Sequence, residues 1–304
     1  MAVQGPDLLR TVSSAGHAVV PLARPGEMTP EKLRDVIAAS PYTFAERLLG
    51  LEPLLVERQP IRPVDEGRSF ASTRGPTPLH TDSQMFLGVP AAIQILVCIK
   101  PASSGGESLL LDGARLLARL ERDEPSLADA IFDVDRVQRF FFGDVSGPTL
   151  ALRGGHLAWT VSPPDTVGPG SIGARLAEEI ARDEREASVV VALRAGEALI
   201  ASNHRMLHGR KAFEGDRELV RLLVWLDTPL AADPRHVKRA KEVAPPPLPH
   251  VRMRIRAVLA ILRGVPPAKL ARENGASEAT LYGWRDAFLR GGLRALEDED
   301  VKYT

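Results

Sequence analysis

The segment Pro78-Leu79-His80-Thr81-Asp82 is the most informative part of this sequence, because two of its side chains could bind one metal ion. Residues two apart on an extended segment point to the same side, so the His80 imidazole and the Asp82 carboxylate face one point. A second histidine, His208, follows much later in the stretch 206–210, Met-Leu-His-Gly-Arg. If the chain folds so that His208 meets the other two side chains, together they offer three ligands to one metal ion.

Two histidines and one carboxylate are the ligand set of non-haem iron(II) oxygenases, and they leave three positions on the metal open. A 2-oxo acid bound through two atoms fills two of these positions, and O2 fills the third. A His-x-Asp pair alone is common by chance. The hypothesis that His80, Asp82 and His208 bind Fe(II) therefore depends on what surrounds them.

An apolar stretch with two arginines follows His208. A strand over 217–225 would place alternate residues on one face, namely Arg217, Leu219, Arg221, Leu223 and Trp225. A guanidinium on an apolar face is costly unless a carboxylate meets it. The distal carboxylate of 2-oxoglutarate would satisfy Arg221 through a bidentate pair, and so would a protein carboxylate. Together with the three candidate ligands, the pattern favours the co-substrate for Arg221, while Arg217 keeps both interpretations.

Short apolar runs between glycine turns predict a largely β fold for the first part of the chain, with turns at Gly105-Gly106 and 195–197. Helical patterns interrupt the strands at about 113–120 and 172–186, and Thr29-Pro30 predicts a helix start. This mixture indicates a mainly β, α+β architecture, a sandwich or jelly roll with helical insertions. The expected strands are 92–100, 108–111, 157–161, 188–193, 198–202 and 219–226.

A run of prolines divides the chain into two parts of different character. Four of the five residues in 245–249 are proline, a composition typical of a stiff, extended linker. We therefore expect an oxygenase domain over 1–244, a linker over 245–250 and a small helical domain over 251–304.

The part after the prolines has a helical and basic pattern, with nine Lys/Arg against three acidic residues over 251–294. It predicts a first helix, a second one starting at Pro266-Pro267, a turn at 274–276, and a third helix capped by Ser277. Leu281, Trp284 and Phe288 are expected to face inward. This is the layout of a helix-turn-helix. Either the third helix binds DNA through Thr280, Tyr282 and Arg285, or the module is a packing or protein-interaction unit, which the sequence slightly favours.

The composition is that of an ordinary soluble protein. Lys plus Arg and Asp plus Glu both number 39, so the net charge indicates neither a nucleic-acid nor a membrane partner. The single cysteine, Cys98, lies in an apolar run and is expected to be buried and unreactive. No signal peptide or membrane span is visible, and a cytoplasmic location is expected.

Two stretches, 77–120 and 202–227, resemble the taurine dioxygenase (TauD/TfdA) superfamily of Fe(II)/2-oxoglutarate oxygenases. Leu79-His80-Thr81-Asp82 and the stretch 206–210 are most similar to the γ-butyrobetaine hydroxylase branch, and Gly105-Gly106-Glu107-Ser108 is similar to the turn Gly-Gly-Asp/Glu-Ser/Thr of that family. The resemblance covers most of 70–227 and is weaker before it. The stretch 277–296 resembles the helix-turn-helix of insertion-sequence transposases.

The resemblance implies a double-stranded β-helix with Fe(II) bound by His80, Asp82 and His208. It also implies that Arg221 holds the distal carboxylate of 2-oxoglutarate with help from the Ser108 hydroxyl. Arg217 is a further candidate contact for the co-substrate. Related halogenases lack the carboxylate found here at Asp82, which argues against halogenation.

The expected function is Fe(II)- and 2-oxoglutarate-dependent hydroxylation of an unactivated C–H bond in a small amino-acid-like or carboxylate/amine metabolite, with O2 consumed and succinate and CO2 released. Desaturation and cyclisation remain open. The alternative is a DNA-binding regulator that senses 2-oxoglutarate. A homo-oligomer is compatible with the sequence, and no membrane partner is expected.

Several neighbours of the candidate ligands have less specific interpretations. His204 lies four residues before His208, where the related family varies, so a surface or supporting role is expected. Gln84 and Asn203 are either polar contacts to substrate or O2, or exposed loop residues. Gln94 is expected in or near the core.

Overall fold

The computed structural model describes residues 5–22, 28–64, 70–86, 88–140, 143–162, 170–244 and 249–298. The chain divides into two compact units, Met1–Pro245 and Pro246–Thr304. Most of the predicted proline linker lies outside the described residues, and Pro249 already begins a helix.

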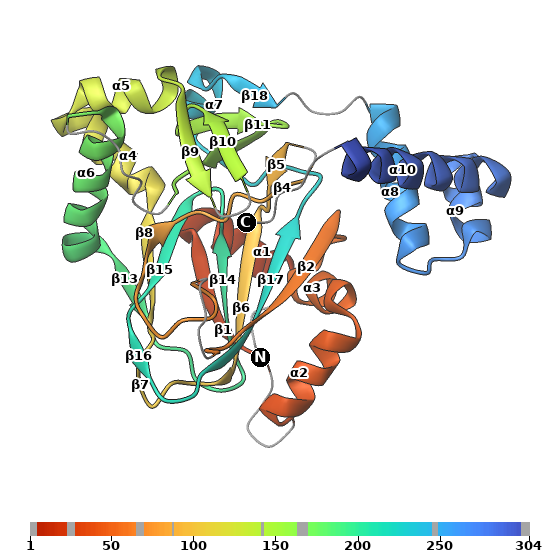
Figure 1. Cartoon of the computed structure of the whole chain (residues 1–304), viewed down its shortest axis with the longest axis horizontal. Helices are drawn as coiled ribbons and strands as arrows, with labels where there is room; N and C mark the ends of the chain where they lie inside the picture. Colours follow the sequence, from red (N-terminus) through yellow and green to blue (C-terminus); the bar gives the residue numbers. More distant parts are fainter. Residues whose placement is uncertain are drawn as a thin grey trace. The chain divides into compact units, whose positions relative to one another are not determined.

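Two antiparallel sheets form the body of the first unit (Figure 1). The larger sheet has the order β1-β14-β6-β17-β2, and the smaller one has the order β13-β8-β15-β3. This mainly β architecture confirms the predicted jelly roll. The strands of the larger sheet are β1 (His17–Pro21), β14 (Glu197–Ser202), β6 (Ile93–Lys100), β17 (Glu218–Trp225) and β2 (Leu55–Ile61). Those of the smaller sheet are β13 (Val189–Val191), β8 (Ser108–Asp112), β15 (Met206–Arg210) and β3 (Thr77–His80).

Helices cover the outer face of each sheet. On the larger sheet, alternate apolar residues of β6 and β17 share one core with α1 (Pro6–Ala15), α2 (Pro30–Ala39) and α3 (Pro41–Leu49). On the smaller sheet, β8 and β15 share a second core with α4 (Gly113–Asp123), α5 (Pro125–Asp133) and α6 (Ile172–Ala187). Because strand residues alternate, every second side chain of these strands points between the sheets instead.

Shorter strands and one more helix complete the unit. A three-stranded sheet has the order β12-β11-β18, and three two-stranded pairs lie beside the main sheets. Their bounds are β4 (Met85–Phe86), β5 (Val89–Pro90), β7 (Ser104–Gly105), β9 (Arg136–Phe140), β10 (Gly143–Gly147), β11 (Leu150–Arg153), β12 (His156–Trp159), β16 (Phe213–Glu214), β18 (Glu242–Ala244) and α7 (Pro234–Arg239).

The local predictions for this unit are largely confirmed. All six predicted strands overlap observed ones, with ends that differ by a few residues. The Thr29 hydroxyl caps α2 by accepting from the Lys32 amide, as the sequence indicates. Cys98 is buried, and burial raises the pKa of its thiol to about 11.

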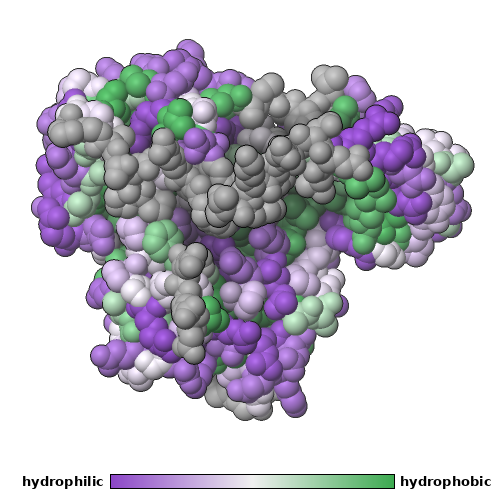
Figure 2. All heavy atoms as spheres, viewed as in Figure 1, coloured by the Kyte–Doolittle hydropathy of each residue, from purple (hydrophilic) through white to green (hydrophobic). Residues whose placement is uncertain are grey.

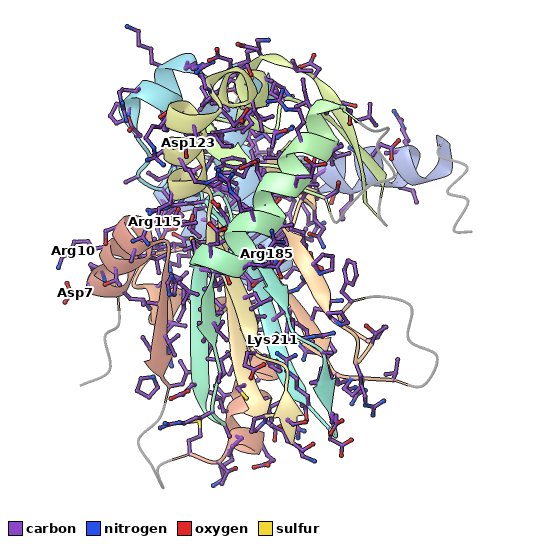
Figure 3. The ribbon with its side chains drawn as sticks, turned by 90° about the vertical axis from the view of Figure 1, so that its left-hand side faces the viewer. Asp7, Arg10, Arg115, Asp123, Arg185 and Lys211 are labelled. Atoms are coloured by element: carbon purple, nitrogen blue, oxygen red, sulfur yellow. The ribbon has the colours of Figure 1, made fainter. Side chains whose placement is uncertain are left out.

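Charged side chains such as Arg10, Arg115 and Lys211 lie at the surface in Figure 3. On the face shown in Figure 2, hydrophobic residues are scattered among hydrophilic ones over the sheets. No helix of the described residues is long and apolar enough to cross a membrane. The cytoplasmic location stays a prediction.

The second unit contains three helices, α8 (Pro249–Leu262), α9 (Pro267–Asn274) and α10 (Glu278–Asp298). Its small core includes Leu270 and Leu281, with Trp284 packed against it. The predicted cap is present, since Ser277 Oγ accepts from the Thr280 amide at 3.0 Å. The inward placement of Phe288 is wrong, because this side chain is 39% exposed. α10 has 21 residues against 8 in α9, and the residues of α10 from 287 to 295 are solvent-exposed.

Candidate metal centre

The pairing of β15 with β3 brings the two candidate histidine ligands side by side. His208 is the register partner of His80, and the centroids of their rings are 4.5 Å apart. Close approach of the strands depends on Gly209, since a Cβ there would lie 2.6 Å from the Thr77 carbonyl oxygen. Asp82 follows the end of β3, and one ligand atom from each of the three side chains lies within 4.8 Å of the others.

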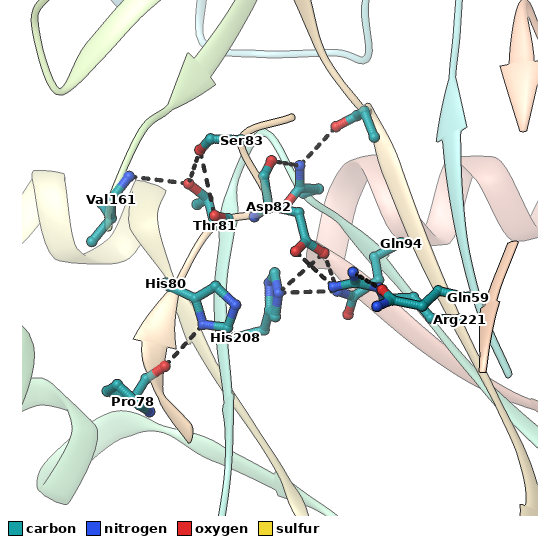
Figure 4. Close-up of polar contacts among 12 residues, drawn as sticks. Gln59, Pro78, His80, Thr81, Asp82, Ser83, Gln94, Val161, His208 and Arg221 are labelled. Atoms are coloured by element: carbon teal, nitrogen blue, oxygen red, sulfur yellow. Dashed lines mark hydrogen bonds and ion pairs between the residues drawn. The ribbon is translucent and has the colours of Figure 1, made fainter. Parts of the chain in front are cut away.

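Asp82 is held by donors from the facing sheet (Figure 4). Arg221 on β17 donates from Nη1 to Oδ1 at 2.7 Å, and Gln94 on β6 donates from Nε2 to Oδ2 at 2.6 Å. Burial alone would raise the pKa of the Asp82 carboxyl, but Arg221 and His208 outweigh it and hold that pKa well below its usual range. Asp82 is therefore a carboxylate at neutral pH.

His80 is held in a neutral form that can bind a metal ion through one ring nitrogen. Its Nδ1 donates to the Pro78 carbonyl oxygen at 2.9 Å, which leaves the Nε2 lone pair available. Burial lowers the pKa of His80 to about 4, and the neighbouring His208 acts in the same direction. Metal ligands must be deprotonated, and two nitrogens with one carboxylate oxygen suit a divalent transition metal. The residues present therefore fit Fe(II).

An arginine cluster, Arg210 and Arg217, lies next to the two histidines. A cavity of about 70 Å³ is lined by both arginines, Arg221, His80 and His208, and also by Ser108, Thr77 and Gln94; none of its lining residues is an aspartate or glutamate. All six site residues predicted from the sequence thus lie at or beside one cavity, although Asp82 itself is not part of its lining.

The two buried arginines of this cluster donate hydrogen bonds to carbonyl oxygens, and both guanidinium groups also lie over the Phe213 ring. Arg217 donates to Gly106 O at 3.2 Å, and Arg210 donates to the carbonyls of Phe70, Thr73 and Gly75. No ion pair links either one to an acidic side chain in the described part of the chain. Burial, together with the charge of Arg210, lowers the pKa of Arg217 to about 10, which still leaves it cationic at neutral pH.

Arg221 pairs with a protein carboxylate. The sequence left two partners open for this arginine, a protein carboxylate or the distal carboxylate of 2-oxoglutarate. Besides the ion pair with Asp82, its Nη2 donates to Gln59 Oε1 on β2. Gln59 escaped sequence reasoning because no local pattern marks a residue whose partner lies more than a hundred positions away. Gln94 was expected only as a core residue, although a polar residue within the apolar run of β6 is itself a signal.

His204 lies outside the ligand cluster. It is buried, its Nε2 donates to the Pro90 carbonyl oxygen at 3.0 Å, and its ring stacks edge-on against His156. Burial lowers the pKa of His204 to about 3, so it is neutral. A larger cavity of about 370 Å³ adjoins His204 between α4, β12 and α7, but no candidate metal ligand lines it.

The fold and the site together define a class, the jelly-roll oxygenases with a His-Asp-His metal centre. A family model described as "Taurine catabolism dioxygenase TauD, TfdA family" matches residues 34–167 and 173–223. The match covers more than half of the chain, and the chain belongs to this family. A second model, "Winged helix-turn helix", matches residues 254–299.

Curated relatives of this chain are dioxygenases. The chain is 29% identical over 163 residues to uridine-5'-phosphate dioxygenase of Streptomyces sp, covering 48% of this chain and 58% of that protein. It is 31% identical over 162 residues to mitochondrial trimethyllysine dioxygenase of Gallus gallus, covering 46% of this chain and 38% of that protein. The chain therefore spans less than two thirds of the length of these relatives.

A solved structure supports the fold. The non-haem iron oxygenase OrfP in complex with Fe and α-ketoglutaric acid matches with a TM-score of 0.50 at 18% identity, covering 73% of this chain and 79% of that one. At this identity the match shows that the two proteins share a fold.

Proposed function

We propose that this protein is an Fe(II)- and 2-oxoglutarate-dependent dioxygenase that hydroxylates an unactivated C–H bond of a small metabolite. The observation that carries the proposal is the single buried site in which a neutral His80, an ionised Asp82 and His208 adjoin arginines without acidic partners. When bound, Fe(II) and 2-oxoglutarate would couple O2 reduction to C–H oxidation, with release of succinate and CO2.

We assign metal binding to His80, Asp82 and His208. Arg221 and Gln94 each donate to one oxygen of the Asp82 carboxylate and so orient it. Such hydrogen bonds to a ligand tune its position and basicity. His208 Nε2 lies 3.5 Å from Asp82 Oδ2, so these two metal-ligand atoms are already close to each other.

The charges in the site favour Arg217 for the distal carboxylate of 2-oxoglutarate. A buried guanidinium without a carboxylate is costly, and a charge-assisted pair would remove that cost. Arg217 has no such partner, whereas Arg221 pairs with Asp82. Ser108 lies two residues after Gly106, to which Arg217 is bonded, and its hydroxyl lines the same cavity. We therefore propose Arg217 with Ser108 as the main contact and Arg221 as the alternative.

The substrate should carry a carboxylate or another anionic group. Three arginines line the cavity without an acidic residue, and one distal carboxylate occupies only part of their capacity. If Arg217 binds 2-oxoglutarate and a metal ion neutralises part of the charge of Asp82, Arg221 is available to bind an anionic group of the substrate. The names of the relatives, uridine-5'-phosphate and trimethyllysine dioxygenase, denote chemically different compounds and select neither.

We further propose the domain division 1–244 and 251–304, with the second part as an accessory unit. The helix-turn-helix match keeps DNA binding by this part as the alternative. The family match and the dioxygenase relatives favour an enzyme over a regulator that senses 2-oxoglutarate.

A coupled turnover assay tests the proposal. The purified full chain, loaded anaerobically with Fe(II), would be exposed to O2 and 2-oxoglutarate with a panel of amino acids and other carboxylates. Succinate formation that rises with one compound, and a product that gains one oxygen atom by mass spectrometry, are expected. His80→Ala should remove both signals. If succinate never forms above the His80→Ala background with any compound or in its absence, the proposal is wrong.

A further inference from the structure

Asn203 occupies the short connection between β14 and β15, five residues before His208. Its side chain is turned away from solvent, and the residue is 1% exposed. Its Oδ1 accepts from the Asp82 amide at 2.8 Å, and its Nδ2 donates to the Asp82 carbonyl oxygen at 2.7 Å. One side-chain amide therefore binds both main-chain polar groups of Asp82.

The same amide also ties this connection to the larger sheet. Asn203 Nδ2 donates to the Ala91 carbonyl oxygen at 2.8 Å, and the Asn203 main-chain amide donates to the Ala92 carbonyl at 3.0 Å. A primary amide offers one acceptor oxygen and two donor hydrogens, and all of these are used here. The side chain has no donor left for a substrate, and Asn203 does not line the cavity beside the two histidines, so a substrate contact is not favoured.

Asp82 needs such an external support because the sheet does not supply one. β3 ends at His80, so the main chain of Asp82 is not part of a strand ladder. Its buried amide and carbonyl would otherwise lack partners, and buried main-chain groups without partners are rare. Arg221 and Gln94 orient the two carboxylate oxygens, but neither fixes the main chain from which the carboxylate projects.

We infer that Asn203 is a positioning residue of the metal centre, which holds the main chain of Asp82 so that its carboxylate faces His80 and His208. This inference rests on the proposed function, because it requires the three side chains to bind metal. Since Asn203 and His208 belong to one short segment, a single connection sets the place of two ligands that are 126 positions apart in number, Asp82 and His208.

Metal binding by the full chain, measured without turnover, tests the inference. Metal-free protein would be titrated with Mn(II) by calorimetry, and its fold checked by circular dichroism. Asn203→Leu keeps the approximate shape and removes every hydrogen bond. Asn203→Asp keeps the acceptor for the Asp82 amide but sets an oxygen against two carbonyls. Both variants should bind Mn(II) about 10- to 100-fold more weakly, the usual effect of losing a group that supports a metal ligand.

His204→Phe is the matched control. His204 is the next residue, is also buried and donates to the Pro90 carbonyl oxygen, but its side chain has no hydrogen bond to Asp82. This variant should bind Mn(II) like the unaltered protein. If a folded Asn203→Leu also binds Mn(II) like the unaltered protein, or if His204→Phe loses as much affinity as Asn203→Leu, the inference is overturned.

His80→Ala separates this inference from the proposed function. If that variant still binds Mn(II) as tightly as the unaltered protein, the proposed metal centre is wrong and the role of Asn203 falls with it. If His80→Ala loses binding while both Asn203 variants keep it, only the role of Asn203 is wrong.

Discussion

One ion pair of the first unit and one ion pair of the second unit lie in opposite environments. In the first unit, Asp82 and Arg221 form an ion pair whose side chains are only 6% and 12% exposed. In the second unit, Lys269 pairs with Glu273 four residues away, and the two side chains are 62% and 52% exposed. A buried charge is costly unless a protein group or a bound ligand pairs with it, whereas an exposed ion pair contributes little to stability.

The contrast between buried and exposed charges indicates which charged residues have a functional role. The second unit is basic, but Arg285, a candidate DNA contact, is bound to its neighbour Asp286 and stacks on Tyr282. The first unit contains buried charges, and two of its buried arginines, Arg210 and Arg217, have no acidic partner among the described residues. Such costs are maintained where a ligand removes them. Experiments on buried and exposed charges should therefore differ sharply in their effects.

The largest effect is expected at the metal ligands. His208→Ala should abolish turnover and weaken Fe(II) or Mn(II) binding by more than about 100-fold, beyond the loss for groups that only support a ligand. His204→Phe should leave both properties close to those of the unaltered protein, since the His204 side chain donates to the Pro90 carbonyl and packs on His156, outside the ligand cluster. Steady-state turnover and calorimetry check this, and the assignment of His208 fails if the two variants exchange roles.

The second largest effect is expected from Arg217, on the KM for 2-oxoglutarate. Arg217→Ala should raise the KM for 2-oxoglutarate far more than that for the substrate, because the loss of a buried charged pair costs about 2–5 kcal/mol, or roughly 30-fold and upward. Arg217→Lys should rescue only part of this, since a lysine cannot bind a carboxylate through two parallel hydrogen bonds.

Arg221→Ala is the contrasting variant, with Lys211→Ala as the control for the loss of one exposed positive charge. Arg221→Ala should weaken metal binding and raise the KM for the substrate, because Arg221 holds Asp82. If it is Arg221→Ala that selectively raises the KM for 2-oxoglutarate, the distal carboxylate belongs to Arg221 as the family resemblance implies.

A smaller effect is expected from acid. Burial lowers the pKa of His204 to about 3 and that of His80 to about 4, so the unfolded chain binds more protons than the folded one below the ordinary histidine pKa of about 6.5. The free energy of unfolding should fall as the pH drops from about 6.5. His204 alone should account for about 2 kcal/mol at pH 5. Urea unfolding of the metal-free protein checks this, and His204→Phe should show a visibly flatter pH dependence.

The smallest effect is expected from removing the second unit. A chain that ends at Ala244 should keep its kcat and KM within about twofold, since a proline-rich boundary is crossed by few contacts. The proposed ligands all precede this boundary. A large loss of turnover in the shortened chain would mean that the helical unit takes part in catalysis.

DNA binding is tested with the same pair of chains. We expect no gel shift that depends on the second unit, because a lone helix-turn-helix unit with surface charges binds DNA weakly. A salt-sensitive shift by the full chain alone, weakened by Arg285→Ala, would instead establish DNA binding.

The sequence by itself determined the features that depend on local geometry. The His-x-Asp spacing puts two side chains on one side of any extended segment, and alternation in 217–225 puts Arg221 on the same face of its strand as Arg217. Helix starts at Thr29 and Ser277 depend on the residue and its next three neighbours. Six observed strands, β6, β8, β12, β13, β14 and β17, were predictable for the same reason, whereas β1, β2 and β15 were not among the predicted strands.

Only the tertiary structure decided which groups meet. Nothing local to Arg221 specifies an ion pair with Asp82, and nothing local to Asn203 specifies three hydrogen bonds to Asp82 and Ala91. Likewise, Phe288 has the helical spacing of a core residue, yet it is 39% exposed and is not part of the core around Leu270 and Leu281. Spacing along a strand or helix sets the direction of a side chain. The group that a side chain contacts depends on how segments far apart in the sequence pack together. The periodicity of the sequence does not specify this packing.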